Sequence, residues 1–247
     1  VLGRELDGFG GVSVQDRLLR GGLPARLLAA GEDPEFYGEW LDSYYARDVQ
    51  ELFPVARRGG FLKLCELLFR QSGGLVEASS LAKHSGLSRP TVGSYLETLQ
   101  TTHLVRVLRP FHGGGRREIL AQPKIYAFDT GFVAHFRGWS DLRPDDCGQL
   151  LEHLALDALC AAHPSRTIHF WRDKQQREID FVIPAGRDSV TAIECKWSPD
   201  QATARNLDAF REHYPKGDNL IVSARPGSGM ESRLGRHRVR HLGIAEL

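Results

Sequence analysis

The sequence predicts a mixed α+β protein, with helices in its first half and a small sheet with flanking helices in its second half. Three observations carry this prediction. Apolar residues recur at helical spacing between residues 36 and 45, a helix-turn-helix order lies within residues 60 to 128, and strand-like runs mix with helical ones after residue 148. The 247 residues, 41% hydrophobic and 26% charged, are enough for two globular domains.

Residues 1 to 56 are expected to be helical around a glycine-rich turn, Arg20 to Pro24. The apolar positions after Pro34 define one face of an amphipathic helix: Phe36, Tyr37, Trp40, Leu41, Tyr44 and Tyr45. Such a face requires a partner surface. We expect that partner either in the rest of this chain or in a domain upstream of it.

Residues 57 to 128 have the order of a helix-turn-helix followed by a wing. Ser88 is a suitable N-cap for the second helix of the motif, and Pro90 stands in its first turn. Two strand-like runs, 104 to 108 and 124 to 128, flank a glycine- and arginine-rich loop. The sequence therefore predicts a winged-helix domain.

This segment is also where the positive charge gathers. It holds eleven Lys or Arg and four Glu, a net charge of +7, whereas the rest of the chain is at −6. A locally basic domain is typical of polyanion-binding modules, and helix-turn-helix proteins present the start of the second helix to DNA. The predicted DNA contacts are Arg89, Thr91, Ser94 and Tyr95, with Arg116 and Arg117 in the wing. A winged helix that binds protein is the alternative.

A connector is expected over residues 129 to 147, and a small mixed sheet over residues 148 to 247. The expected elements are a helix at 149–161, strands near 167–172, 178–183 and 190–196, a helix near 201–213 and a strand at 219–224. The tail after Pro226 is rich in glycine and arginine and predicts one weak strand.

Two successive strands of this region carry charges within apolar runs. Asp180 lies in Glu178 to Ile183, and Glu194 and Lys196 stand two residues apart in the next strand, so alternation puts both on one face. If the two strands form a hairpin, Asp180 lies beside Glu194. Charges at such positions are costly to bury unless they are paired or bound to a cation.

Two neighbouring carboxylates form a hard oxygen site that suits Mg²⁺ or Mn²⁺. A lysine beside such a site can orient water or stabilise charge on a phosphate. We therefore predict Asp180, Glu194 and Lys196 as catalytic residues, with Asp180 and Glu194 as metal ligands and Glu152, among leucines in the preceding helix, as a third. The alternative is a structural cluster of ion pairs, Glu194 with Lys196 and Asp180 with Arg177.

These residues resemble the PD-(D/E)XK nuclease superfamily, whose core runs helix, three strands, helix, strand. Asp180 is similar to its second-strand Asp, Glu194 and Lys196 to its Glu-x-Lys, and Glu152 to the helix carboxylate of part of the superfamily. The resemblance implies a nuclease-like mixed sheet with flanking helices.

The wider order of motifs resembles the C-terminal two thirds of a prokaryotic AAA+ ATPase family, whose nucleotide-binding domain precedes a domain of unknown function. The motifs are GGLP, SYYARDV, PKIYAFDTG, LLEHLALDAL, REIDFVI and AIECK. The resemblance implies DNA-associated work, a lid-like origin for residues 1 to 56, and an ATPase domain upstream or in a partner. The sequence contains no G-x-x-x-x-G-K-[ST] loop, so we do not expect the isolated chain to be an ATPase.

Two functions follow, from different classes. One is a Mg²⁺-dependent DNA phosphodiesterase, and the other is a non-catalytic DNA-binding or protein-interaction module that couples DNA to an ATPase motor, with an oligomer as one form of assembly. The four cysteines form no C-x-x-C pair, and the sequence has no apolar run long enough to span a bilayer, so we expect reduced thiols, no membrane contact and a cytoplasmic protein.

Overall fold

The computed structural model describes residues 3–9, 11–29, 31, 33–50, 57–113, 122–186, 188–225, 227 and 229–247. The chain divides into two compact units. The sheet unit comprises Val1–Gln15, Leu108–Ala121 and Leu142–Leu247, and the helical unit comprises Asp16–Val107 and Gln122–Asp141. The mixed α+β class is thus confirmed. This division differs from the predicted domain boundaries, because residues of the expected connector and of the N-terminal segment belong to the helical unit.

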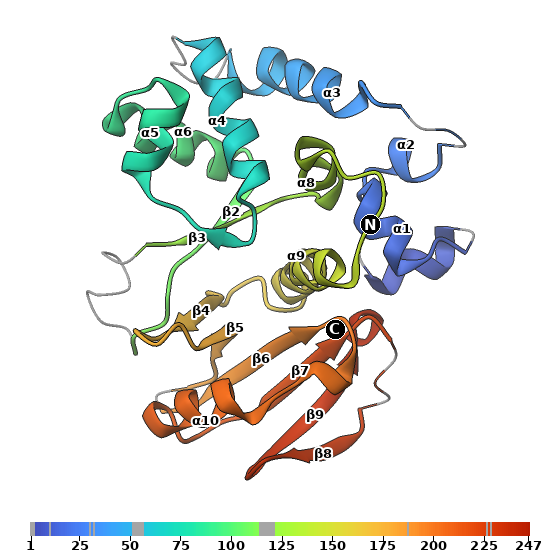
Figure 1. Ribbon diagram of the computed structural model, residues 1–247, viewed down its shortest axis with the longest axis vertical. Coiled ribbons are helices and arrows are strands. Elements are labelled where there is room, and N and C mark those ends of the chain that lie inside the picture. Colours follow the sequence, from blue (N-terminus) through green and yellow to red (C-terminus); the bar gives the residue numbers. More distant parts are fainter. Residues whose placement is uncertain are drawn as a thin grey trace. The chain divides into compact units, whose positions relative to one another are not determined.

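The helical unit holds the elements from α1 to α8 in Figure 1, except that the first two residues of α1 and the last residue of β2 fall in the sheet unit. They are α1 (Val14–Arg20), α2 (Pro24–Leu27), α3 (Phe36–Tyr44), the π-helix η2 (Tyr45–Val49), α4 (Arg58–Arg70), β1 (Gly74–Leu75), α5 (Ala78–Ser85), α6 (Arg89–Thr101), β2 (Val105–Leu108), β3 (Lys124–Ala127) and α8 (Thr130–Arg137). The three strands form one sheet in the order β1-β3-β2. This order of helices and strands is the one predicted for residues 57 to 128.

The aromatic face of α3 finds its partner inside the helical unit. Tyr37 and Trp40 pack their rings edge-on against Phe132 of α8, at centroid distances of 4.6 and 5.1 Å. α8 itself lies within the stretch that the sequence predicted as a connector, and Asp129 caps it by accepting a hydrogen bond from the backbone N–H of Gly131. Part of the predicted connector is therefore a capped helix whose apolar residues are buried.

The sheet unit holds a six-stranded sheet in the order β4-β5-β6-β7-β9-β8. Its elements are η1 (Gly3–Phe9), α9 (Pro144–Ala162), β4 (His169–Arg172), β5 (Glu178–Pro184), β6 (Val190–Lys196), η3 (Pro199–Gln201), α10 (Ala204–His213), β7 (Asn219–Ser223), β8 (Glu231–Leu234), β9 (His237–Gly243) and η4 (Ile244–Glu246). β4, β5 and β6 are antiparallel neighbours, whereas β6, β7 and β9 run parallel. The tail forms two strands where the sequence predicted one.

The two long helices of this unit pack against its sheet (Figure 1). Leu207 and Phe210 of α10 share an apolar core with Ala192 of β6 and Val182 of β5. Leu159 of α9 instead lines a hollow together with Ile193, the next residue of β6. Because neighbouring residues of a strand point to opposite faces, α9 and α10 cover opposite faces of the sheet. Among the described helices, none is long and apolar enough to cross a membrane.

Candidate functional site

The hairpin of β5 and β6 places the predicted carboxylates on neighbouring strands. The described pairing of the strands runs from Pro184–Val190 to Phe181–Ile193, and Asp180 and Glu194 are the next residues along. At this point a side chain replaces the backbone pairing between the strands, because Oδ2 of Asp180 accepts a hydrogen bond from the backbone N–H of Cys195 at 2.7 Å. Both carboxylates are buried, with Asp180 8% and Glu194 7% exposed.

Lys196 lies between these two carboxylates. Its Nζ donates to Oε2 of Glu194 at 2.6 Å and lies 3.6 Å from Oδ2 of Asp180. The other oxygen of Glu194, Oε1, is buried and accepts no hydrogen bond from the described residues with good geometry, although the Asn206 side chain of α10 is close enough to favour the ionised form. A buried carboxylate oxygen without a partner carries a desolvation cost that a cation would offset.

The electrostatics of this cluster follow from its burial. Desolvation and the neighbouring charge of Asp180 raise the pKa of Glu194 to about 7, against the opposing pull of Lys196. Burial by itself would lower the pKa of Lys196, but the two carboxylates outweigh it and raise that pKa above its usual range. The cluster therefore keeps its lysine charged and leaves Glu194 close to titration at neutral pH.

Glu152 approaches from a different side. It lies on α9, and its charge contributes, after burial and Asp180, to raising the pKa of the Cys195 thiol. Cys195 alternates with Glu194 and Lys196 and so belongs to the opposite face of β6. Within the described part of the chain, no three His, Cys, Asp or Glu residues form a possible metal-holding group. The structure thus unites Asp180, Glu194 and Lys196, but it does not add Glu152 to them as a third ligand.

The alternative of two structural ion pairs is only half present. Glu194 does pair with Lys196, but Arg177 pairs with Asp173, from which its Nε lies 2.6 Å away and whose Oδ1 also accepts the Arg177 backbone N–H. Asp180 is therefore balanced by Lys196 and a backbone N–H. Asn206 is the residue near the cluster that the sequence analysis missed, and nothing in its sequence context marks it.

The predicted DNA contacts differ in how exposed they are in the helical unit. Ser88 caps α6 as predicted, with its Oγ accepting the Thr91 backbone N–H at 3.2 Å, and Arg89 and Ser94 are exposed nearby while Thr91 is partly buried. Tyr95 is a correction, because it is 4% exposed and its ring packs against Phe61 at 5.4 Å. It lies one turn after Val92 and on the same apolar face of α6 as Leu99.

Arg116 and Arg117 of the predicted wing lie outside the described residues.

Comparisons with known proteins place two family models on the chain. The family described as Domain of unknown function (DUF8612) matches residues 12–143, and Domain of unknown function (DUF4143) matches residues 147–232. The uncharacterized proteins Rv2008c of Mycobacterium tuberculosis and Mb2031c of Mycobacterium bovis are each 28% identical over 182 residues, which are 70% of this chain. The match covers only 41% of the length of those relatives.

A solved assembly of McrB AAA+ hexamers with bound McrC from Thermococcus gammatolerans is also similar, at 13% identity and a TM-score of 0.34, over 97% of this chain and 69% of that one.

Proposed function

The chain belongs to the family of the domain of unknown function DUF8612, and we propose that it is the DNA-binding, nuclease-like part of an AAA+ type ATPase. In this proposal the cluster of Asp180, Glu194 and Lys196 is a divalent-metal site for phosphodiester hydrolysis, and the helix-turn-helix of the helical unit holds the DNA. The motif order from GGLP to AIECK supports the ATPase relationship, and the +7 charge of residues 57 to 128 supports the DNA partner.

The observation that carries the catalytic half of the proposal is the buried Oε1 of Glu194 beside Asp180, which accepts no well-formed hydrogen bond from the described residues. A purely structural ion pair has no need for a second buried carboxylate oxygen that is so poorly satisfied. Two carboxylates also suit Mg²⁺, which is usually held by one or two protein carboxylates and completes its shell with water and substrate phosphate oxygens. The absence of a third protein ligand among the described residues is compatible with that preference.

The residues of the chain would divide the work as follows. Asp180 and Glu194 would hold Mg²⁺ or Mn²⁺, which when bound supplies a Lewis acid and lowers the pKa of water. Lys196, which stays charged beside them, would turn its ammonium toward the phosphate and stabilise the charge that develops there. The Cys195 N–H fixes the carboxylate of Asp180, so its free oxygen needs little reorganisation.

A second candidate is a non-catalytic module that couples DNA to an ATPase motor. The position of Lys196 favours it, since the ammonium at 2.6 Å from Glu194 and 3.6 Å from Asp180 already neutralises much of the cluster. In that case the lysine would be a permanent partner of the carboxylates. The two functions then differ in whether a divalent cation competes with Lys196.

A thermal melt with and without millimolar Mg²⁺ or Mn²⁺ separates the two candidates. We expect the metal to raise the wild-type Tm, because it binds the native state preferentially. Asp180→Asn and Glu194→Gln should be at least as stable as wild type without metal and should lose this rise. Lys196→Ala should keep the rise, which should be larger because its carboxylates repel without the lysine, and should lose cleavage of plasmid DNA.

Asp208→Asn is the matched control, since Asp208 is a carboxylate of the same unit that pairs with Arg236 and His237. It should leave both the metal-dependent rise and cleavage unchanged. If the metals leave the wild-type Tm unchanged and the two carboxylate variants are sharply destabilised, the cluster is a structural ion pair. The non-catalytic module would then replace the nuclease.

A further inference from the structure

The edge of the six-stranded sheet carries a face of arginines that the cluster of Asp180, Glu194 and Lys196 does not use. Arg233 of β8 stands directly opposite Arg238 of β9, and Arg240 stands opposite Glu231. Arg240 is in register with Leu220 of β7, which is in turn in register with Ile193 of β6. The three arginines therefore lie on the α9 side of the sheet, opposite the face of Glu194 and Lys196.

Arg233 and Arg238 face each other across the ladder, whereas Arg240 faces the carboxylate of Glu231. Like charges directly opposite one another on antiparallel strands destabilise the pair, as Arg233 and Arg238 do here. All three are exposed, and none has an ion pair or hydrogen bond from its side chain to the described residues. Arg236, in the turn between the same strands, differs because it pairs with Asp208 at 3.1 Å. The Arg233–Arg238 pair is thus unfavourable for folding unless an anion lies over it.

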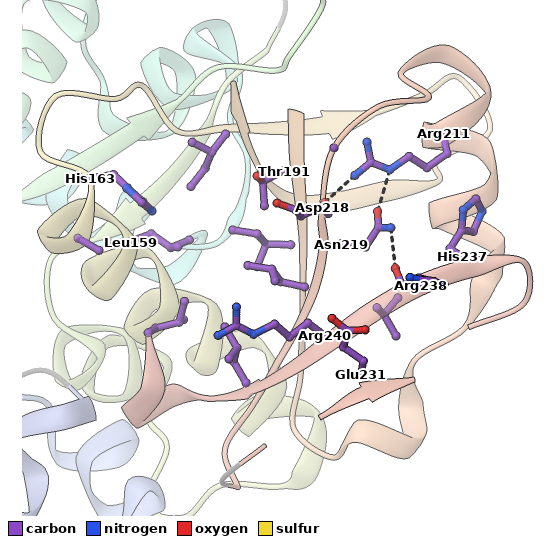
Figure 2. A pocket seen from close by; sticks show the side chains of 18 of the residues that line it. Leu159, His163, Thr191, Arg211, Asp218, Asn219, Glu231, His237, Arg238 and Arg240 are labelled. Carbon is purple, nitrogen blue, oxygen red and sulfur yellow. Dashed lines mark hydrogen bonds between the residues drawn. The ribbon is translucent and has the colours of Figure 1, made fainter. Parts of the chain in front are cut away.

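Beside this face lies a hollow of about 820 Å³ between the end of α9 and β9 (Figure 2). Leu159, Thr191 and Ile193 form part of its wall, and Arg166, Arg238 and Arg240 bring positive charge to it. Figure 2 shows Arg240 extending from β9 across the hollow. Arg211, which also lines it, is committed to structure, since it donates hydrogen bonds to the carbonyl oxygens of Val190, Tyr214, Lys216 and Asp218 and to Asn219.

The carboxylates that line the hollow limit the kind of anion that can bind there. Asp218, Glu231 and Glu246 also line the hollow, so a small anion would not find an all-positive cage. An extended polyanion can instead follow the arginines along the strands. Arg238 and Arg240 are two residues apart, about 7 Å along a strand, which is similar to the spacing of successive phosphates in a nucleic acid.

We propose that Arg166, Arg233, Arg238 and Arg240 form a surface that binds the phosphate backbone of DNA, separate from both the helix-turn-helix and the carboxylate cluster. The choice of DNA as the polyanion rests on the proposed function, whereas the surface itself rests on the register of β8 and β9. Because this surface and the cluster are on opposite faces of the sheet, DNA bound here does not occupy the cluster.

The test measures binding of fluorescently labelled duplex DNA by anisotropy across a series of NaCl concentrations. The variant Arg238→Gln/Arg240→Gln should bind more weakly at low salt, and the slope of log K against log[NaCl] should fall by up to about two units, about 0.9 for each lost phosphate contact. The matched control is Arg205→Gln on α10, which removes an exposed arginine that also has no ion pair to the described residues. It should leave the slope unchanged.

Two further readouts keep the result unambiguous. DNA should raise the Tm of wild type more than that of the double variant, and size-exclusion chromatography should show the variant to be as monodisperse as wild type. An unchanged slope, or a variant that keeps wild-type binding but self-associates, would overturn the proposal in favour of arginines that merely protect a sheet edge. Asp180→Asn should abolish cleavage while keeping this binding, so loss of the arginine surface and loss of the nuclease hypothesis are separate outcomes.

Discussion

At the scale of single residues, Glu194 is the most unusual group of the cluster. It is 7% exposed, one of its oxygens lacks a partner in the described structure, and its pKa is raised to about 7 by burial and by Asp180. A glutamate with a raised pKa favours its protonated form in the folded state. The stability that this provides is fully present below the ordinary glutamate pKa and is lost as the pH rises through the folded value.

This gives a pH prediction for Glu194→Gln in metal-free buffer. Between pH 4.5, the ordinary pKa of a glutamate, and about pH 7, the free energy of unfolding of wild type should fall relative to that of the variant. The difference should be on the order of 2–3 kcal/mol. Urea titrations at several pH values measure it. A flat difference for Glu194→Gln would mean that Glu194 is ionised at low cost.

At the scale of elements, two of the sequence motifs act on each other. Asp129 of PKIYAFDTG accepts the backbone N–H of Gly131, at the start of α8, and that of Gly22 in GGLP, the latter at 2.6 Å. Gly21 and Gly131 are both needed here, because a Cβ on Gly21 would clash with Asp129 Oδ1 and one on Gly131 would clash with the Tyr37 hydroxyl. These motifs are thus structural in the helical unit.

Asp129→Ala tests the hydrogen bonds by which Asp129 connects the GGLP turn to the start of α8. It removes the carboxylate that two buried backbone N–H groups donate to, at about 1–3 kcal/mol each, so we expect the free energy of unfolding to fall by about 2–5 kcal/mol. Asp129→Asn keeps one acceptor oxygen and should lose about half as much. Denaturation followed by tryptophan fluorescence reports both. A loss below about 0.5 kcal/mol for the alanine variant, within the range of an ordinary surface substitution, would show that water replaces the carboxylate.

At the scale of the whole molecule, DNA binding is expected from the helix-turn-helix and its wing. Changing Arg116 and Arg117 to Ala should weaken duplex binding regardless of sequence and lower the salt slope by up to about two units. Arg89→Ala should instead reduce sequence preference, as expected for a base contact in the major groove. Competition assays against random DNA distinguish the two effects. If the slope and the preference both stay at wild-type values, these arginines do not contact DNA and the protein-binding alternative is favoured.

Local sequence patterns determined much of the architecture. The alternation of apolar residues in β5 and β6 predicted that Glu194 and Lys196 share a face, and the Ser88-Pro90 signal predicted the start of α6, because both depend on neighbours within a few residues. Tyr95 was predicted as a DNA contact, although its spacing from Val92 and Leu99 already places it on the apolar face of α6. Phe61, far away in the sequence, is the ring that this face packs against.

Only the tertiary structure decided how the charged residues are paired. Lys196 lies close to both carboxylates, and Arg177 pairs with Asp173 and not with Asp180. Three arginines of the tail share one face of the sheet because the registers of β7, β8 and β9 align them. A sequence does not show which charged side chains will pair, because the partners depend on which strands become neighbours. The physical reason is that strand order and register are set by the burial of the whole apolar core, which no local window of residues contains.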